Sequence, residues 1–164
     1  MSNVIKSSSS YSNTEQPGVI GKVYEELFTD SSGLVSVRYL RCFKASTGGV
    51  SKGDVIGAAA ANVGKMYSTG LAVKSPGAGM EIGKLYGVAV ADVAEDSYGF
   101  CVCRGIMEKV SSHTGVAIGG LLATHATNGM VTNLTIGAGL SSQILGYAMT
   151  ATASASVTAY ISIL

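Results

Sequence analysis

The last third of the chain, residues 110–164, reads VSSHTGVAIGGLLATHATNGMVTNLTIGAGLSSQILGYAMTATASASVTAYISIL. It contains no Asp, Glu, Lys or Arg, although about 25% of the residues of a soluble domain are ordinarily charged. Gly, Ser, Thr and Asn interrupt every apolar run, which is not the pattern of a membrane span. Short apolar runs between turn residues predict β-strands. Because an uncharged β segment is poorly protected against edge pairing, we expect its own N-terminal half or other subunits to cover it.

The composition of the whole chain favours a single all-β domain. The 164 residues are 47% hydrophobic and 13% charged, with 22 Gly and only 2 Pro. A chain of this length can bury a sizeable core. Many glycines with few charges are typical of short strands joined by tight turns. We therefore predict a small β-barrel, β-tulip or sandwich with little helix.

Charge and cysteine content bear on partners and compartment. The formal net charge is +1, which provides no basic face for a nucleic acid. The 3 cysteines do not make a disulfide framework. The start of the chain lacks the apolar region of a secretory signal, and no apolar run is long enough for a spanning helix. We expect a soluble protein of a reducing cytoplasm that binds neither nucleic acid nor membrane.

Residues 1–18 are predicted to form an N-terminal arm, and residues 19–164 a single β domain. The arm is polar and Ser-rich and cannot bury enough apolar surface to fold alone. Two interpretations remain open. The arm is either a disordered tail, or an extended segment that becomes ordered on a partner and reaches roughly 50 Å. In the second case the candidate partner contacts in and after the arm are Val4, Ile5, Tyr11, Val19 and Ile20.

Apolar and polar residues alternate from Leu34 to Lys44, which is typical of a half-buried strand. Its apolar side chains share one face, which we expect to point to the core: Val35, Val37, Tyr39 and Phe43. Arg41 falls on the same face. We expect it near the end of the strand, where its guanidinium can reach water.

Residues 50–109 and 116–164 are interpreted as two related modules of one duplicated β unit. Each has a turn, a short strand, a strand led by glycine and a closing alternating strand. Five pairs of residues align at a constant offset: Gly87 with Gly146, Ala89 with Ala148, Ala94 with Ala153, Ser97 with Ser156, and Val102 with Ile161.

The two modules differ in charge at corresponding turns. Acidic residues of the first module give way to neutral ones in the second: Asp92, Glu95 and Asp96 correspond to Ala151, Ser154 and Ala155. We predict that the neutral module faces other subunits, with Ser154 and Ala155 as candidate contacts, and that the charged module faces water.

The chain offers no motif for catalysis, a cofactor or a metal. Gly137-Ala138-Gly139 resembles the start of a dinucleotide fingerprint, but no acidic residue follows to hold a ribose. The acidic turn of the first module is better explained as solvated than as paired catalytic carboxylates. Four possible zinc ligands match no zinc spacing and are better explained without a metal, the thiols as core residues: Cys101, Cys103, His113 and His125. We predict that the protein is not an enzyme and has no cofactor.

Short motifs recur in a fixed order over residues 50–164. In the second module they are Gly119-Gly120-Leu121-Leu122-Ala123, Asn128-Gly129-Met130-Val131-Thr132 and Leu145-Gly146-Tyr147-Ala148-Met149, before a closing strand from Val157 to Leu164. In the first module they are Gly53-Asp54-Val55-Ile56 and Leu85-Tyr86-Gly87-Val88-Ala89. This order resembles the capsid decoration (cement) proteins of tailed bacteriophages.

The resemblance implies a virion structural protein on the outer capsid surface, made in the host cytoplasm. Such proteins are small β-barrel or β-tulip domains, commonly trimers, that bridge capsomers and use a terminal arm. The implied partners are the major capsid protein and further copies of this chain, as a homotrimer. An alternative is a phage fibre- or receptor-binding-associated β module, in which some of the 8 tyrosines would contact glycans.

Overall fold

The computed structural model describes residues 11–12, 15–58, 71–74, 84–127, 129–134 and 144–163. The described part of the chain is 54% strand and 1% helix, which confirms the predicted all-β class with little helix. The strands are β1 (Val23–Thr29), β2 (Val35–Ala45), β3 (Val55–Ala58), β4 (Leu71–Lys74), β5 (Leu85–Ala89), β6 (Tyr98–Ser111), β7 (Leu121–Thr124), β8 (Val131–Asn133), β9 (Gly146–Ala148) and β10 (Ser156–Ser162).

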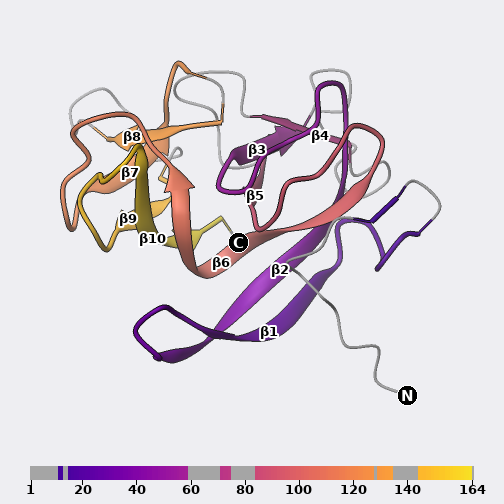
Figure 1. Cartoon of the computed structure of the whole chain (residues 1–164), viewed down its shortest axis with the longest axis horizontal. Coiled ribbons are helices and arrows are strands. Elements are labelled where there is room, and N and C mark those ends of the chain that lie inside the picture. The colour runs from indigo at the N-terminus through magenta and orange to yellow at the C-terminus, as the bar shows by residue number, and fades with distance from the viewer. Residues whose placement is uncertain are drawn as a thin grey trace.

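These strands belong to one sheet with the order β1-β2-β4-β3-β5-β6-β10-β9-β7-β8, and β2 also pairs with β6 (Figure 1). The strand pairings are antiparallel apart from a short parallel contact of β2 with β4. The sheet as a whole is not closed into a barrel, and its end strands β1 and β8 do not pair with each other. Of the expected β-barrel, β-tulip or sandwich, a closed barrel of the whole sheet is therefore corrected, although β2, β4, β3, β5 and β6 return to β2 through the β2–β6 pairing.

The long strand β6 is shared by two groups of strands. In the first group β2, β4, β3 and β5 follow one another, and both β5 and β2 pair with β6. In the second group β10, β9, β7 and β8 follow one another outward from β6. Ser112, the residue directly after β6, forms a parallel bridge with Val131 of β8. The last strand of the second group therefore also contacts the end of β6. The two groups lie on either side of β6 in Figure 1.

Two clusters of buried side chains meet at β6. Successive residues of a strand point to opposite faces, and β6 is buried on both. Cys101 belongs to a smaller cluster with Phe43, Ile56 and Tyr86 from β2, β3 and β5. Phe100 belongs to a larger cluster that continues into the second group of strands. The core is therefore continuous across both modules.

Arg41 corrects the expectation that its guanidinium reaches water. Only 3% of the residue is exposed. It pairs with Cys101 of β6, and its Nη1 donates to the carbonyl oxygen of Tyr86 at 3.2 Å. The strand continues past Arg41 to Ala45, and β5 and β6 enclose this part of it. Local alternation does not predict which non-local strands will cover a residue.

The two modules repeat the same backbone hydrogen bonds. In the first, Gly53 N–H donates to Ala89 and Ala89 N–H donates to Asp54. In the second, Gly119 N–H donates to Ala148 and Ala148 N–H donates to Gly120. Duplication of one β unit remains our interpretation of this recurrence.

Gly87 in the middle of β5 and Gly146 at the start of β9 share an unusual backbone. Gly87 and Gly146 both have φ of 154°. A Cβ at Gly87 would overlap the carbonyl oxygen of Val102, and one at Gly146 would overlap the carbonyl oxygen of Tyr160. Only glycine lets each short strand approach the closing strand of its module this closely.

We predict that Gly146→Ala destabilises the protein by about 3 kcal/mol or more, because backbone strain adds to overpacking. The matched control is Gly33→Ala, at φ of 86° with no atom within 4 Å of its added Cβ. The control should lose only about 1 kcal/mol from the backbone. Urea unfolding measures both, and equal losses would show that the close approach at Gly146 is unimportant.

Candidate partner-binding surface

Several large apolar side chains lie on the surface of the described residues. They are Val19, Leu27, Leu34, Val35, Val37, Ile118, Tyr147 and Met149. Scattered apolar residues are normal on a protein surface, whereas a contiguous patch marks an interaction site. Their positions in the sheet decide between these cases.

Strand pairing makes most of these side chains part of one continuous surface. Leu27 of β1 pairs with Val37 of β2, and Tyr39 of β2 pairs with Arg104 of β6. Paired residues of antiparallel strands point to the same face. The surface continues through β10 to β9. We call it the outer face and define it by Leu27, Val35, Val37, Tyr39, Arg104, Tyr147, Met149 and Tyr160.

Tyrosines and one arginine form the middle of the outer face. The Arg104 guanidinium lies 5.9 Å from the centre of the Tyr39 ring. A side-chain hydrogen bond with Tyr160 raises the pKa of Arg104. The Tyr160 ring in turn stacks on Tyr147, with ring centres 5.5 Å apart. Tyrosine and arginine are enriched at the centres of protein–protein interfaces, so this composition fits a protein partner.

The position of Val35, Val37 and Tyr39 corrects the expectation of a face that points to the core. Val35 is 59% exposed and Val37 48% exposed, whereas Phe43, farther along the same face, is fully buried. The first half of β2 extends with β1 as a hairpin beyond the body of the sheet (Figure 1). The apolar side chains on this face of β2 are therefore exposed in the first half of the strand and buried in the core in the second half.

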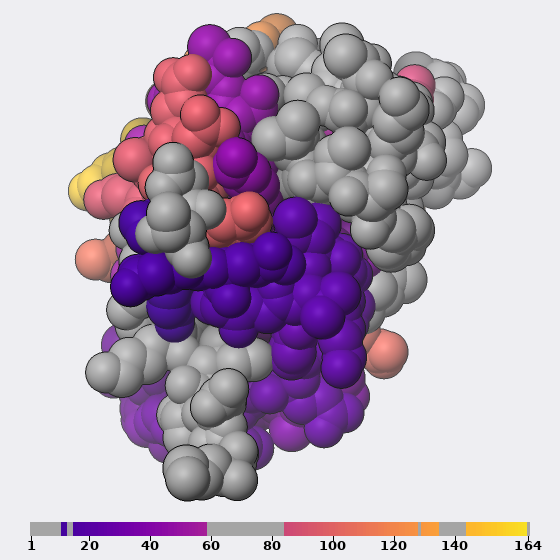
Figure 2. Space-filling view, turned by 90° about the vertical axis from the view of Figure 1, so that its right-hand side faces the viewer, coloured from indigo at the N-terminus to yellow at the C-terminus, as the bar shows by residue number. Residues whose placement is uncertain are grey.

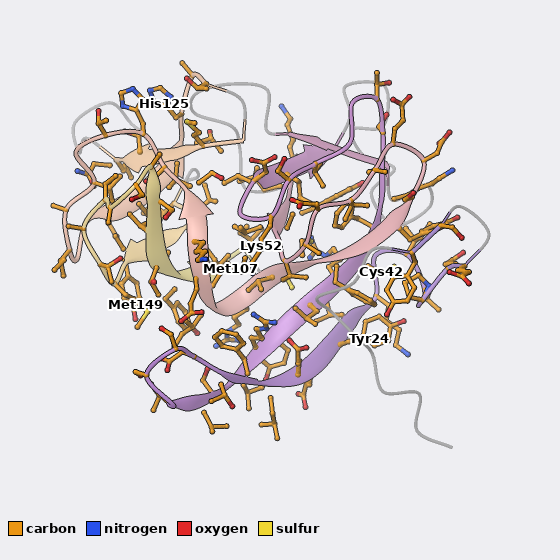
Figure 3. The ribbon with its side chains drawn as sticks, viewed as in Figure 1. Tyr24, Cys42, Lys52, Met107, His125 and Met149 are labelled. Carbon is orange, nitrogen blue, oxygen red and sulfur yellow. The ribbon has the colours of Figure 1, made fainter. Side chains whose placement is uncertain are left out.

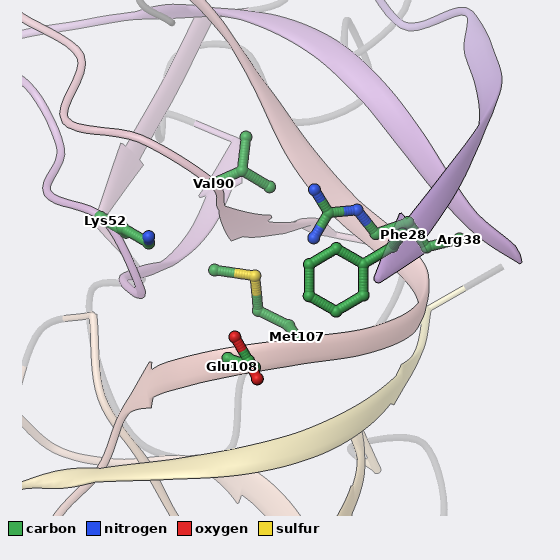
Figure 4. Close-up of a pocket in the computed structure, with 6 residues that line it drawn as sticks. All are labelled: Phe28, Arg38, Lys52, Val90, Met107 and Glu108. Atoms are coloured by element: carbon green, nitrogen blue, oxygen red, sulfur yellow. The ribbon is translucent and has the colours of Figure 1, made fainter. Parts of the chain in front are cut away.

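The other face of the hairpin forms a small charged pocket with β6 (Figure 4). Its volume is about 130 Å³, and it is lined by Phe28, Arg38, Lys52, Val90, Met107 and Glu108. The Arg38 guanidinium lies 4.0 Å from the centre of the Phe28 ring, and its Nε donates to Glu26. Glu108 accepts the Ser31 backbone N–H at 2.8 Å. The Glu108 contact holds the hairpin tip against β6, whereas the Arg38 contacts link the two strands of the hairpin.

The possible zinc ligands are not brought together. Cys101 is buried, its Sγ lies 3.4 Å from the carbonyl oxygen of Tyr86, and burial raises the pKa of its thiol. His113 and His125 stack on each other with ring centres 4.0 Å apart, and Figure 3 shows His125 at the end of the molecule away from Cys42. Among the described residues no three His, Cys, Asp or Glu side chains are grouped so that they could hold a metal ion.

The acidic turn of the first module is exposed, and each carboxylate has a partner within the chain. Asp92 accepts the Lys52 backbone N–H at 2.8 Å, Glu95 accepts that of Gly48 at 3.1 Å, and Asp96 forms an ion pair with Lys44. These contacts are typical of a solvated turn that orders a neighbouring loop.

The N-terminal partner contacts predicted from the sequence are only partly described. Val4 and Ile5 lie outside the described residues. Tyr11 bridges to Tyr98, and its ring packs edge-on against Phe100, so its ring is engaged within the chain. Val19 is 62% exposed and Ile20 is half-buried. The first described residues form an indigo band across the side of the molecule in Figure 2.

Ser154 and Ala155 form the exposed turn before β10. Their φ angles are 50° and 58°, and the flanking Ala153 and Ser156 exchange both backbone hydrogen bonds. This is a two-residue hairpin turn with positive φ at both positions, which favours Asn and Gly. Neither side chain belongs to the outer face. The partner contacts predicted at this turn stay a prediction, and the sequence pattern did not single out Leu27, Arg104 or the stacked tyrosines.

Comparisons of this chain with protein-family models, curated proteins and solved structures found no match. None of the helices in the described part of the chain has the length and apolarity needed to cross a membrane.

We predict that Ala155→Gly stabilises the protein by about 1 kcal/mol, because alanine is strained at positive φ and glycine is not. Ala151→Gly is the matched control in the same loop, since Ala151 is exposed and lacks positive φ. The control should be neutral or slightly destabilising. Thermal unfolding separates the two, and a stabilised control with an unchanged Ala155→Gly variant would contradict the turn assignment.

Glu108 makes the attachment of the hairpin tip sensitive to acid. The backbone hydrogen bond from Ser31 lowers the pKa of Glu108 in the folded protein. A lowered folded pKa contributes stability above the unfolded pKa, and this contribution is lost as pH falls through the folded pKa. Between neutral pH and pH of about 3, wild type should lose more stability in urea unfolding than Glu108→Gln. Parallel pH profiles would contradict this role.

Proposed function

We propose that the protein is a virion structural protein, specifically a decoration (cement) protein of the outer capsid surface of a tailed bacteriophage. The observation that carries an assembly role is the outer face. It is contiguous, apolar and aromatic, and it spans both modules. Surfaces of this kind are ordinarily covered by a protein. The capsid as the place of assembly comes from the motifs that resemble decoration proteins.

Those motifs occupy equivalent structural positions, which supports their use as a family signature. Gly53-Asp54-Val55-Ile56 forms the turn and start of β3, and Gly119-Gly120-Leu121-Leu122-Ala123 forms the turn and start of β7. The strands that contain Gly87 and Gly146 are β5 and β9. The resemblance therefore involves hydrogen-bonded turns and strands and not only shared composition.

In this proposal two different surfaces bind two different partners. The outer face associates with further copies of the chain, and the N-terminal arm contacts the major capsid protein. Many modest interfaces, each of about 800 Å² per partner, then hold the capsid by mass action and multivalency. Tyr11, within the predicted arm, forms a backbone bridge with Tyr98.

A fibre- or receptor-binding-associated module remains the second candidate, because Tyr39, Tyr147 and Tyr160 share the outer face. Exposed aromatic rings provide platforms for sugar rings through stacking contacts. Glycan-array binding by the isolated protein that is lost in Tyr147→Ala would favour this function over decoration.

Deletion of residues 2–10 tests the role of the arm while keeping Tyr11 in place. We expect at least roughly tenfold weaker co-sedimentation with undecorated capsids, about 1.4 kcal/mol, and an unchanged unfolding midpoint. The substitutions Val4→Asp and Ile5→Asp together should reproduce the loss, whereas Ser8→Asp and Ser9→Asp add the same charge and should not. Full occupancy by the deleted protein would contradict the arm contact, and no binding by wild type would contradict decoration.

A further inference from the structure

Three side chains of the sheet form a charged row across the outer face. Glu25 of β1 pairs with Tyr39 of β2, and Tyr39 pairs with Arg104 of β6. Glu25 and Arg104 are exposed, and Tyr39 is half-buried. Because neighbouring strands lie about 4.8 Å apart, the backbones of Glu25 and Arg104 lie at similar distances on either side of Tyr39. The row carries one negative and one positive charge about a central ring.

We propose that the outer face is covered by the outer face of a second copy of this chain, related by a two-fold axis that runs along β2. A two-fold contact uses the same surface on both copies. Rotation about this axis lays β1 of one copy over β6 of the other, and β2 over β2. Glu25 of each copy then meets Arg104 of the other, and the two Tyr39 rings meet at the axis.

The apolar side chains obey the same symmetry. Leu27 and Val37 lie one step along the strands from Glu25 and Tyr39. On β6 the corresponding step leads from Arg104 to Ile106, which pairs with Tyr160 of β10. Ile106 is buried and lies beyond the last residue of β6 that pairs with β2, so the rotation sets Leu27 toward Tyr160, and Val37 over Val37.

Charge selects this axis over the other two-fold arrangement of the same faces. An axis across the strands would lay Glu25 on Glu25 and Arg104 on Arg104, and like charges in a desolvated contact oppose association. Two ion pairs within the described residues are Arg38 with Glu26 and Lys44 with Asp96, and neither involves Glu25 or Arg104. The partners of Arg104 within its own chain are the tyrosines Tyr160 and Tyr39 and not carboxylates, so its positive charge can still pair with Glu25 of a second copy.

This pairing goes beyond the capsid role and does not depend on it. It concerns β1, β2, β6 and β10, whereas the proposed capsid contact is the N-terminal arm. It also predicts two-fold association in place of the homotrimer that the resemblance implies, because a closed trimer uses two different surfaces of each copy.

Charge reversal in the full-length protein tests the pairing by sedimentation equilibrium. Wild type should be a dimer at micromolar concentration. Glu25→Arg and Arg104→Glu should each weaken the dimer by about tenfold or more, because each leaves like charges opposed. The double variant E25R/R104E restores opposite charges and should recover dimer formation. The matched controls Glu15→Arg and Lys22→Glu change charge before β1 and should dimerise as wild type.

Three results would overturn the pairing: a monomeric or trimeric wild type, undiminished dimers of both single variants, or a double variant as weak as the singles. Unchanged unfolding midpoints of the variants exclude misfolding as the cause. Capsid co-sedimentation of the same proteins keeps the two proposals apart. Failure of wild type to bind capsids overturns decoration and leaves the dimer measurement intact.

Discussion

Hydrogen bonding along both edges of β6 is the constraint on which the rest of the structure depends. The first half of this strand pairs with β2, its second half pairs with β10, and Arg104 pairs with both. The next residue, Gly105, has φ of 114°, and a Cβ there would press against the Arg38 backbone and side chain. The strand therefore changes partners at a glycine. Both groups of strands and the continuous core follow from this change.

The outer face is a consequence of the same geometry. β2 enters the body of the sheet only from about Arg41 onward, where β6 and β5 enclose it, and its first half stays outside with β1. An apolar alternation that suits a core on one half of the strand becomes an exposed apolar surface on the other half. The contact of Glu108 with Ser31 keeps the other side of the hairpin against β6, and the ion pair of Arg38 with Glu26 links the two strands of the hairpin. The hairpin is thus held with its apolar side outward.

The sequence predicts what is local in this structure and misses what is non-local. Alternation and turn residues predict the all-β class, and the offset between Gly87 and Gly146 picks out two glycines with the same φ of 154°. The burial of Arg41 depends on β5 and β6, which are more than forty residues away along the chain. The outer face joins β1, β2, β6, β10 and β9, and no local pattern marks such a set. Apolar and polar residues alternate in the same way in the exposed half and in the buried half of β2. The sequence alone could therefore not tell the exposed half from the buried half.

The outer face also suggests a reason why the last third of the chain carries no charge. Its inward residues Val157, Ala159 and Ile161 are buried, and its outward residues Tyr160 and Tyr147 form the aromatic end of the outer face. Neutral side chains there leave Glu25 and Arg104 as the charges that flank Tyr39. With few charges on a face, each one has a larger share in deciding which partner and which orientation fit. The absence of charge in residues 110–164 is therefore better explained as a condition for oriented association than as general insulation from water.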